Sequence, residues 1–132
     1  MNSFKGNIIA LTTSGSLTLL KVKVLNSQIT AIVIDTPETL KYLKINSEVT
    51  VFFKETEVII GKGNTDNISM QNQFKGTIVS IATKALLSKL TIASEIGEIT
   101  SIITTNAVKQ LDLREGLAVK AMIKTNEILV SE

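Results

Sequence analysis

Alternating apolar and polar residues dominate this chain and predict β-strands. From Leu17 to Leu25, apolar side chains alternate with Lys21 and Lys23, which is the pattern of a strand with one buried and one exposed face. The turn-forming pair Asn26-Ser27 follows this strand. Similar patterns predict strands at residues 4–12, 28–34, 48–54 and 57–60, and later at 74–83, 90–94, 98–104, 118–124 and 127–130.

One segment in each half changes from this period of two to a helical pattern. Thr36 can cap a helix, Pro37 is favoured at the first helical position, and an acidic residue follows in the first turn. A short helix is therefore predicted from this point to about Leu43. Its counterpart is predicted at residues 107–113.

The order of elements is the same in both halves because the sequence is repeated. Phe4-Lys5-Gly6 recurs as Phe74-Lys75-Gly76, and the alignment continues without a gap to Gly61 against Ser131. A register kept over a whole unit indicates two copies of one small domain. The identical pairs include Leu17/Leu87, Leu20/Leu90, Ile29/Ile99, Thr30/Thr100, Ile32/Ile102, Leu43/Leu113, Val49/Val119, Lys54/Lys124 and Glu57/Glu127.

Each copy contains five predicted strands with one short helix between the third and the fourth, which is typical of a small OB-like barrel. We expect an all-β fold with short helices, built of two tandem OB-like five-stranded β-barrels, in which the last strand of each copy closes its own barrel. The predicted domains are residues 1–61 and 69–132. The polar, glycine-rich residues 62–68 between them are predicted to form a flexible linker.

Composition favours association of these small units. Copies of about sixty residues can bury only a marginal core. The chain of 132 residues has no cysteine for disulfides and no histidine to join a structural zinc site. Hydrophobic residues nevertheless make up 44% of the chain, and its mean hydropathy is +0.30. Contact between the halves and between whole chains is the remaining way to gain buried area, so we expect a homo-oligomer.

Charge and hydropathy limit the partners and the compartment. The net charge is +2, the pI is about 8.9, and the lysines are scattered, so the chain lacks the concentrated basic face of a nucleic-acid-binding protein. The first residues show no signal pattern, and the longest apolar runs are too short to cross a membrane. These features predict a cytoplasmic protein without a membrane partner.

Side-chain chemistry favours binding over catalysis. Without histidine or cysteine, the chain lacks the usual general base, thiol nucleophile and transition-metal ligands, so we expect neither an enzyme nor a bound metal cation. Hydroxyls, amides and an ammonium group can still hold a tetrahedral oxyanion. Such donors collect at strand ends and loop entries of the second copy, as Ser69, Gln71, Asn72, Thr104, Thr105, Lys124 and Thr125. Turn formation and a solvated lysine would account for the same residues, so composition leaves both interpretations open.

The second copy resembles the Mop or TOBE domain of molbindins in four segments that follow one another in the right order. The run from Ser69 to Ile78 is similar to the opening of that domain, Ser-x-Arg-Asn-x-(aromatic)-x-Gly-x-(aliphatic). Residues 98–108 resemble its central strand, residues 111–116 its Leu-x-Leu-x-x-Gly helix end, and residues 119–125 its valine–lysine strand. The first copy follows the pattern more loosely.

The resemblance implies an oxyanion site whose residues can be carried over one by one. In this sequence they are Ser69, Gln71, Asn72, Thr104, Ala107 and Lys124, with Thr125 beside the lysine. Gln71 stands where the family has arginine, which removes a charge and a bidentate donor, and Ala107 stands where it has serine. In the first copy, Ile34 and Pro37 replace the threonine and the serine, so only Lys54 remains as a weaker candidate.

For function, the resemblance implies cytoplasmic molybdenum storage and homeostasis, with molybdate or tungstate held at the subunit interfaces of a homo-oligomer. Tandem molbindins suggest a trimer, which we favour, and regulator-like proteins suggest a dimer. A second hypothesis is the ligand-sensing effector half of a molybdate-responsive transcription regulator. Such regulators carry a preceding helix-turn-helix domain that this sequence lacks, so the chain would then be a fragment.

A third hypothesis is an OB-type nucleic-acid-binding module. Such a module needs exposed aromatic side chains on a basic face. Phe4 and Phe74 are equivalent in the repeat and are predicted to lie in the core instead, which does not favour a nucleic-acid partner.

Overall fold

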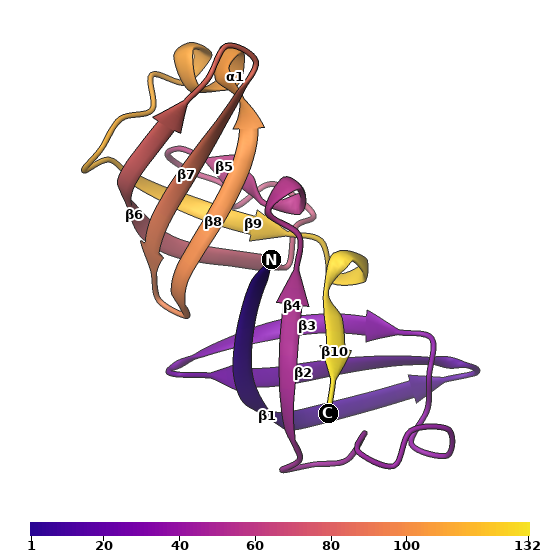
Figure 1. The fold of residues 1–132 in the computed structure, drawn as a ribbon. Helices are drawn as coiled ribbons and strands as arrows, with labels where there is room; N and C mark the ends of the chain where they lie inside the picture. The colour runs from indigo at the N-terminus through magenta and orange to yellow at the C-terminus, as the bar shows by residue number, and fades with distance from the viewer.

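The computed structural model describes all residues, 1–132, as two five-stranded β-sheets. Each sheet curls into a barrel, and Figure 1 shows one barrel above the other. The first copy contains the strands β1 Asn2–Ser14, β2 Leu17–Val24, β3 Ser27–Val33, β4 Glu48–Phe53 and β5 Ile59–Gly61. The second copy contains β6 Asn72–Thr83, β7 Leu87–Ser94, β8 Gly97–Thr104, β9 Ala118–Ile123 and β10 Leu129–Ser131. The predicted all-β fold of two tandem OB-like units is confirmed.

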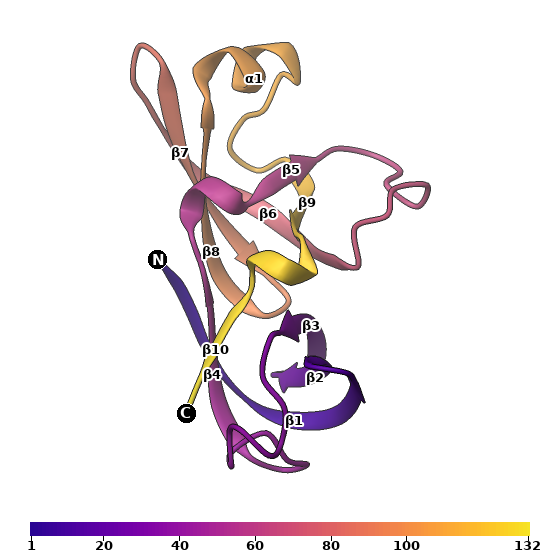
Figure 2. The ribbon, with the colours of Figure 1, turned by 90° about the vertical axis from the view of Figure 1, so that its right-hand side faces the viewer.

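The two copies exchange their last strands. β10, at the end of the second copy, pairs antiparallel with β4, and β5, at the end of the first copy, pairs with β9. The first barrel therefore has the order β10-β4-β1-β2-β3, and the second barrel has the order β5-β9-β6-β7-β8. Figure 2 shows β10 leaving the second barrel to run beside β4. The prediction that each copy closes its own barrel with its own last strand is wrong.

Two short 3-10 turns direct this exchange. η1 Glu55–Glu57 follows β4, and η2 Thr125–Glu127 follows β9. Each turn carries the chain out of one sheet and onto the neighbouring barrel, where η1 packs against β8 and η2 packs against β3. The closing strands of the two copies have the same apolar pattern, so each barrel accepts the strand of the other copy without loss of packing.

The long first strand of each copy, β1 or β6, pairs with two neighbouring strands. Residues 2–7 of β1 pair with β4, whereas residues 7–14 pair with β2, and a bulge lies in the second stretch. At Gly6 the two strands approach so closely that an added Cβ would lie 2.3 Å from the carbonyl oxygen of Lys23. Gly76 of β6 is also crowded by β7, since an added Cβ would lie 2.6 Å from the side chain of Ile92 and 2.8 Å from the carbonyl oxygen of Ala93. This close approach explains why Phe-Lys-Gly occurs in both copies.

The second copy forms the predicted helix between its third and fourth strands. α1 covers Thr105–Gln110 and so begins slightly earlier than predicted. The hydroxyl oxygen of Thr104 accepts a hydrogen bond from the backbone N–H of Ala107 at 3.0 Å and caps the helix.

The first copy forms turns where a helix was predicted from Pro37 to Leu43, so that prediction is wrong. The side chain of Thr39 accepts a hydrogen bond from the backbone N–H of Thr36 at 2.8 Å and donates to its carbonyl oxygen at 3.0 Å. Together with the bond from the backbone N–H of Leu40 to the carbonyl oxygen of Thr36 at 2.9 Å, these bonds form one helical turn. The helix does not continue, because the next backbone N–H groups, those of Leu43 and Lys44, bond to residues only three and two positions back.

One hydrophobic cluster of 24 buried residues contains members of both barrels. The core of one copy is therefore continued by the core of the other, as the small size of each unit requires. Residues 62–68 are held against the second barrel. The hydroxyl of Thr65 donates to Gln73 Oε1 at 2.6 Å, and the ammonium group of Lys62 donates to the carbonyl oxygen of Leu111 at 2.8 Å. No helix of the structure has the length and apolar character needed to cross a membrane.

Candidate functional site

Five of the predicted site residues lie in two chain segments that meet at the junction of the barrels. They are Ser69, Gln71 and Asn72 in one segment and Lys124 and Thr125 in the other. Asn72 and Ile123 are partners in the β6–β9 ladder, so residues 69–71 before β6 are neighbours of Lys124–Thr125 after β9. The side chains of residues 69, 71 and 124 are exposed. Lys124 precedes η2 and forms no ion pair, so its ammonium group is free to meet an anion.

The side chain of Asn72 is buried and joins the two barrels. Its Oδ1 accepts a hydrogen bond from the backbone N–H of Thr30 at 2.8 Å, and its Nδ2 donates to the carbonyl oxygen of Thr30 at 2.8 Å. Asn2 makes the equivalent pair of bonds with Thr100 of β8, at 2.8 and 2.9 Å. We call these two pairs the asparagine clamps. Asn72 thus lies beside Lys124, while its amide group is directed at the backbone of the first barrel.

Thr104 lies in a different part of the molecule from Lys124. It is exposed at the end of β8, where it caps α1 with Ala107 beside it. η2, which follows Lys124, packs against β3 of the first barrel instead. A single chain therefore does not bring Thr104 and Lys124 to one anion. Thr105 is buried, and its hydroxyl donates to the carbonyl oxygen of Lys84 at 2.6 Å, so it supports the hairpin rather than facing solvent.

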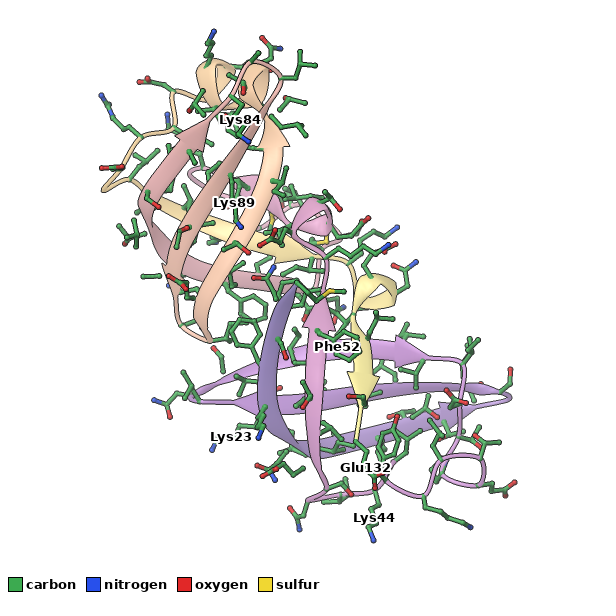
Figure 3. All side chains as sticks on the ribbon, in the orientation of Figure 1. Lys23, Lys44, Phe52, Lys84, Lys89 and Glu132 are labelled. Carbon is green, nitrogen blue, oxygen red and sulfur yellow. The ribbon has the colours of Figure 1, made fainter.

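Two apolar grooves lie at equivalent places in the two barrels. No backbone pairing joins β3 to β10 or β8 to β5, so each barrel stays open along one line. The β3–β10 groove has a volume of about 550 Å³, and the β8–β5 groove has a volume of about 470 Å³. Lining residues of the first include Leu17, Ile32, Ile34, Asn126 and Leu129, and those of the second include Leu87, Ile102, Thr104, Thr56 and Ile59. In Figure 3, Phe52, which also lines the β3–β10 groove, lies where β4 and β10 run together.

The first copy has Lys54 and Glu55 where the second has Lys124 and Thr125. The carboxylate of Glu55 accepts a hydrogen bond from the hydroxyl of Thr100, and it lies 3.4 Å from the ammonium group of Lys89 on β7. The hydrogen bond from Thr100, aided by the charge of Lys89, holds the pKa of Glu55 below its ordinary value in spite of partial desolvation. Lys54 and Glu55 also line a pocket of about 200 Å³.

Glu55 and Lys89 are not among the residues that the sequence analysis selects. A signal was present in the comparison of the copies, because Glu55 aligns with Thr125 and Lys89 aligns with Leu19. Their meeting depends on the packing of η1 from the first copy against the second barrel, which the repeat alone does not predict. Figure 3 shows Lys89 on the face of the second barrel, with Lys84 at its outer end near α1.

The aromatic side chains offer no exposed platform for stacking bases. Phe53 and Phe74 are buried, and Phe4 stacks on Phe53 with ring centroids 5.9 Å apart. The half-buried Tyr42 donates its hydroxyl to the carbonyl oxygen of Val130 at 3.3 Å. The nucleic-acid hypothesis therefore lacks the surface that it requires.

Comparison with known proteins agrees with this architecture. Residues 68–130 match the TOBE domain. The molybdenum-pterin-binding proteins 1 and 2 of Clostridium pasteurianum are 31% and 29% identical to this chain over 65 residues, which is 48% of this chain and 96% of each of those proteins. The structure of the cytoplasmic molybdate-binding protein ModG with molybdate bound is 28% identical and superposes with a TM-score of 0.89, covering 98% of this chain and 94% of that one. The chain belongs to the Mop/TOBE family.

Proposed function

We propose that this protein binds molybdate or tungstate and serves cytoplasmic molybdenum storage and homeostasis. The observation that carries this proposal is the agreement with molybdate-bound ModG over 98% of the chain at a TM-score of 0.89. Both Clostridium pasteurianum relatives are molybdenum-pterin-binding proteins by name. A role in binding rather than catalysis fits a chain without histidine or cysteine.

The donor chemistry of the candidate site suits this ligand. Molybdate is fully deprotonated at neutral pH and only accepts hydrogen bonds. Ser69 and Thr125 offer hydroxyl donors, Gln71 offers an amide, and Lys124 supplies the positive charge. Hydrogen phosphate carries a proton that needs an acceptor, so a site made of donors favours molybdate over phosphate. Asn72 contributes by holding the start of β6 in place, because its side chain is already paired with Thr30.

The site is completed by a second copy of the chain. Thr104 lines the β8–β5 groove, whereas η2, which begins after Lys124, borders the β3–β10 groove through Asn126. Thr104 of one chain reaches Lys124 of another only if these two different grooves face each other. The grooves also expose apolar side chains beside unpaired strand edges, including Ile34, which is 81% exposed. This apolar surface becomes buried when the β3–β10 groove of one chain packs against the β8–β5 groove of another.

This contact joins two different surfaces, the β3–β10 groove of one chain and the β8–β5 groove of another. A closed assembly with such contacts is either a ring of chains or a twofold dimer in which the contact is made twice. We favour a trimer and accept a dimer as the alternative. Light scattering checks the assembly directly. A protein that binds molybdate tightly while remaining a monomer at micromolar concentration would contradict the shared site.

Isothermal titration with molybdate, tungstate, sulfate and phosphate tests the function. We expect heat with molybdate and tungstate, and much weaker or no binding of sulfate and phosphate. If none of the four anions binds, the oxyanion function is wrong.

A further inference from the structure

We propose that the carboxylate of Glu55 takes the place of a bound oxyanion in the first copy. Only the second copy is then left with a position that can bind a free oxyanion. This inference rests on the proposed oxyanion function of the Lys124 site. We call the surroundings of Lys54 and Glu55 the η1 position, and those of Lys124 and Thr125 the η2 position.

The two positions have the same backbone and different charges. In both, a lysine ends the fourth strand of its copy and precedes a 3-10 turn that crosses to the other barrel. The lysine is identical in the two copies, and the first residue of the turn is glutamate in one and threonine in the other. The η1 position therefore carries a negative charge that the η2 position lacks.

The contacts of Glu55 are those that an oxyanion would make. Its carboxylate accepts the hydroxyl hydrogen of Thr100 and lies 3.4 Å from the ammonium group of Lys89, with Lys54 on the same pocket. A hydroxyl donor and an ammonium group at one acceptor are donors of the kind that molybdate requires. The protein thus satisfies these donors with its own side chain.

Lys89, the ion-pair partner of Glu55, is also specific to the η1 position. At the η2 position its equivalent is Leu19, so a second cation is present only where the carboxylate is present. The lowered pKa of Glu55 agrees with this arrangement, because it keeps the carboxylate charged at neutral pH. The neighbouring pocket of about 200 Å³ has room for several waters, each of which takes about 30 Å³ in the liquid, so charge rather than lack of space keeps a second anion out.

Replacing Glu55 should therefore open a second site. Glu55→Thr gives the first copy the residue of the second, and Glu55→Gln keeps the size while removing the charge. Glu57→Thr is the matched control, since Glu57 lies in the same turn and forms neither an ion pair nor a side-chain hydrogen bond. Thr125→Glu is the reciprocal change and should close the η2 position.

The measurement is the number of molybdate ions bound per chain in isothermal titration of the 132-residue chain, with circular dichroism to confirm folding. We expect one additional molybdate per chain in Glu55→Thr and in Glu55→Gln, no change in Glu57→Thr, and loss of the original site in Thr125→Glu. A gain in either Glu55 variant that is absent from the control supports the inference.

The outcomes separate this inference from the proposed function. If the unmodified protein binds molybdate and neither folded Glu55 variant gains a site, the inference is overturned and the function stands. If the unmodified protein binds nothing and a Glu55 variant binds one ion, the inference is supported and the η2 assignment is wrong. If no variant and no parent protein binds, both are overturned.

Discussion

The first and second copies are alike in their strands and clamps and differ at the turns between them. Gly6 and Gly76 meet the same steric demand, and Asn2 and Asn72 make the same bonds across the junction. The η1 and η2 positions instead differ in charge, because the acidic Glu55 stands where the second copy has the neutral Thr125. The asparagine bonds that hold the two barrels together are kept in both copies, whereas the first residue of each 3-10 turn has diverged. A duplicated fold can therefore retain its architecture while its two potential sites take different roles.

The largest expected effect comes from removing residues 129–132, which are β10 and the terminal Glu132. This strand belongs to the second copy but pairs with β4, so we expect the first barrel to lose stability. Leu129 is 46% exposed and Val130 is half-buried, so their lost packing should cost roughly 2–3 kcal/mol in all, at about 1.5–3 kcal/mol for a fully buried side chain. The lost hydrogen bonds of the ladder with β4 should add about 0.5–1.5 kcal/mol each. Hydrogen exchange should show lost protection in β4 and retained protection in β9.

Deletion of Glu132 alone is the control for this truncation and should leave exchange unchanged. Protection lost first in β9 would show that the last strand closes its own copy, and would contradict the exchange of strands.

Both asparagine clamps should contribute to stability. Asn72→Ala leaves the backbone N–H and carbonyl of Thr30 without partners in a buried site, and Asn2→Ala does the same to Thr100 in a partly buried site. At about 1–3 kcal/mol for each unsatisfied buried group, Asn72→Ala should lower the free energy of unfolding by roughly 2–6 kcal/mol. Asn2→Ala should cost less, because Thr100 is not fully buried. Urea denaturation measures the change, with the exposed Asn67→Ala as control. If Asn72→Ala weakens molybdate binding without a loss of stability, the clamp role of Asn72 is wrong.

The two repeat-equivalent lysines should differ in their effect on molybdate binding. Lys124 forms no ion pair and precedes Thr125, whereas Lys54 precedes Glu55 and lines the same pocket as that acidic residue. A hydrogen bond to a charged group contributes about 1.5–3 kcal/mol, so Lys124→Ala should weaken binding roughly ten- to hundredfold. Lys54→Ala should have a clearly smaller effect. Equal losses in isothermal titration would show that the two positions do not differ as described.

The smallest expected effect concerns pH. The pKa of Glu55 is lowered in the folded protein, first by the hydrogen bond from Thr100, so its ionised form favours folding. That contribution is present above the ordinary glutamate value of 4.5 and is lost as the pH falls below 4.5 through the lowered folded value. Glu55→Gln removes it, so the stability difference between the two proteins should be larger at pH 7 than at pH 3. Urea midpoints at several pH values measure this difference, and a gap that does not change with pH would contradict it.

Much of the fold and part of the site could be predicted from the sequence. Alternating residues and the gapless repeat determined the strands, the two OB-like units and the burial of Phe74, because period and burial are local consequences of which side chains are apolar. Gln71 and Lys124 come directly before β6 and directly after β9, which are paired, and the set of site residues built around them stays a prediction. The helix after β3 stops after one turn in the first copy, although Pro37 favours its start, because the backbone N–H groups of Leu43 and Lys44 bond to residues only three and two positions back.

Only the tertiary structure decided how the two copies combine. Both closing strands have the same apolar pattern, so the sequence is compatible with either pairing, and the 3-10 turns after β4 and β9 select the exchanged one. That choice brings Glu55 to Lys89 and separates Thr104 from Lys124. A repeated sequence specifies the surfaces that can pair, whereas the partner of each surface depends on contacts between residues far apart in the chain.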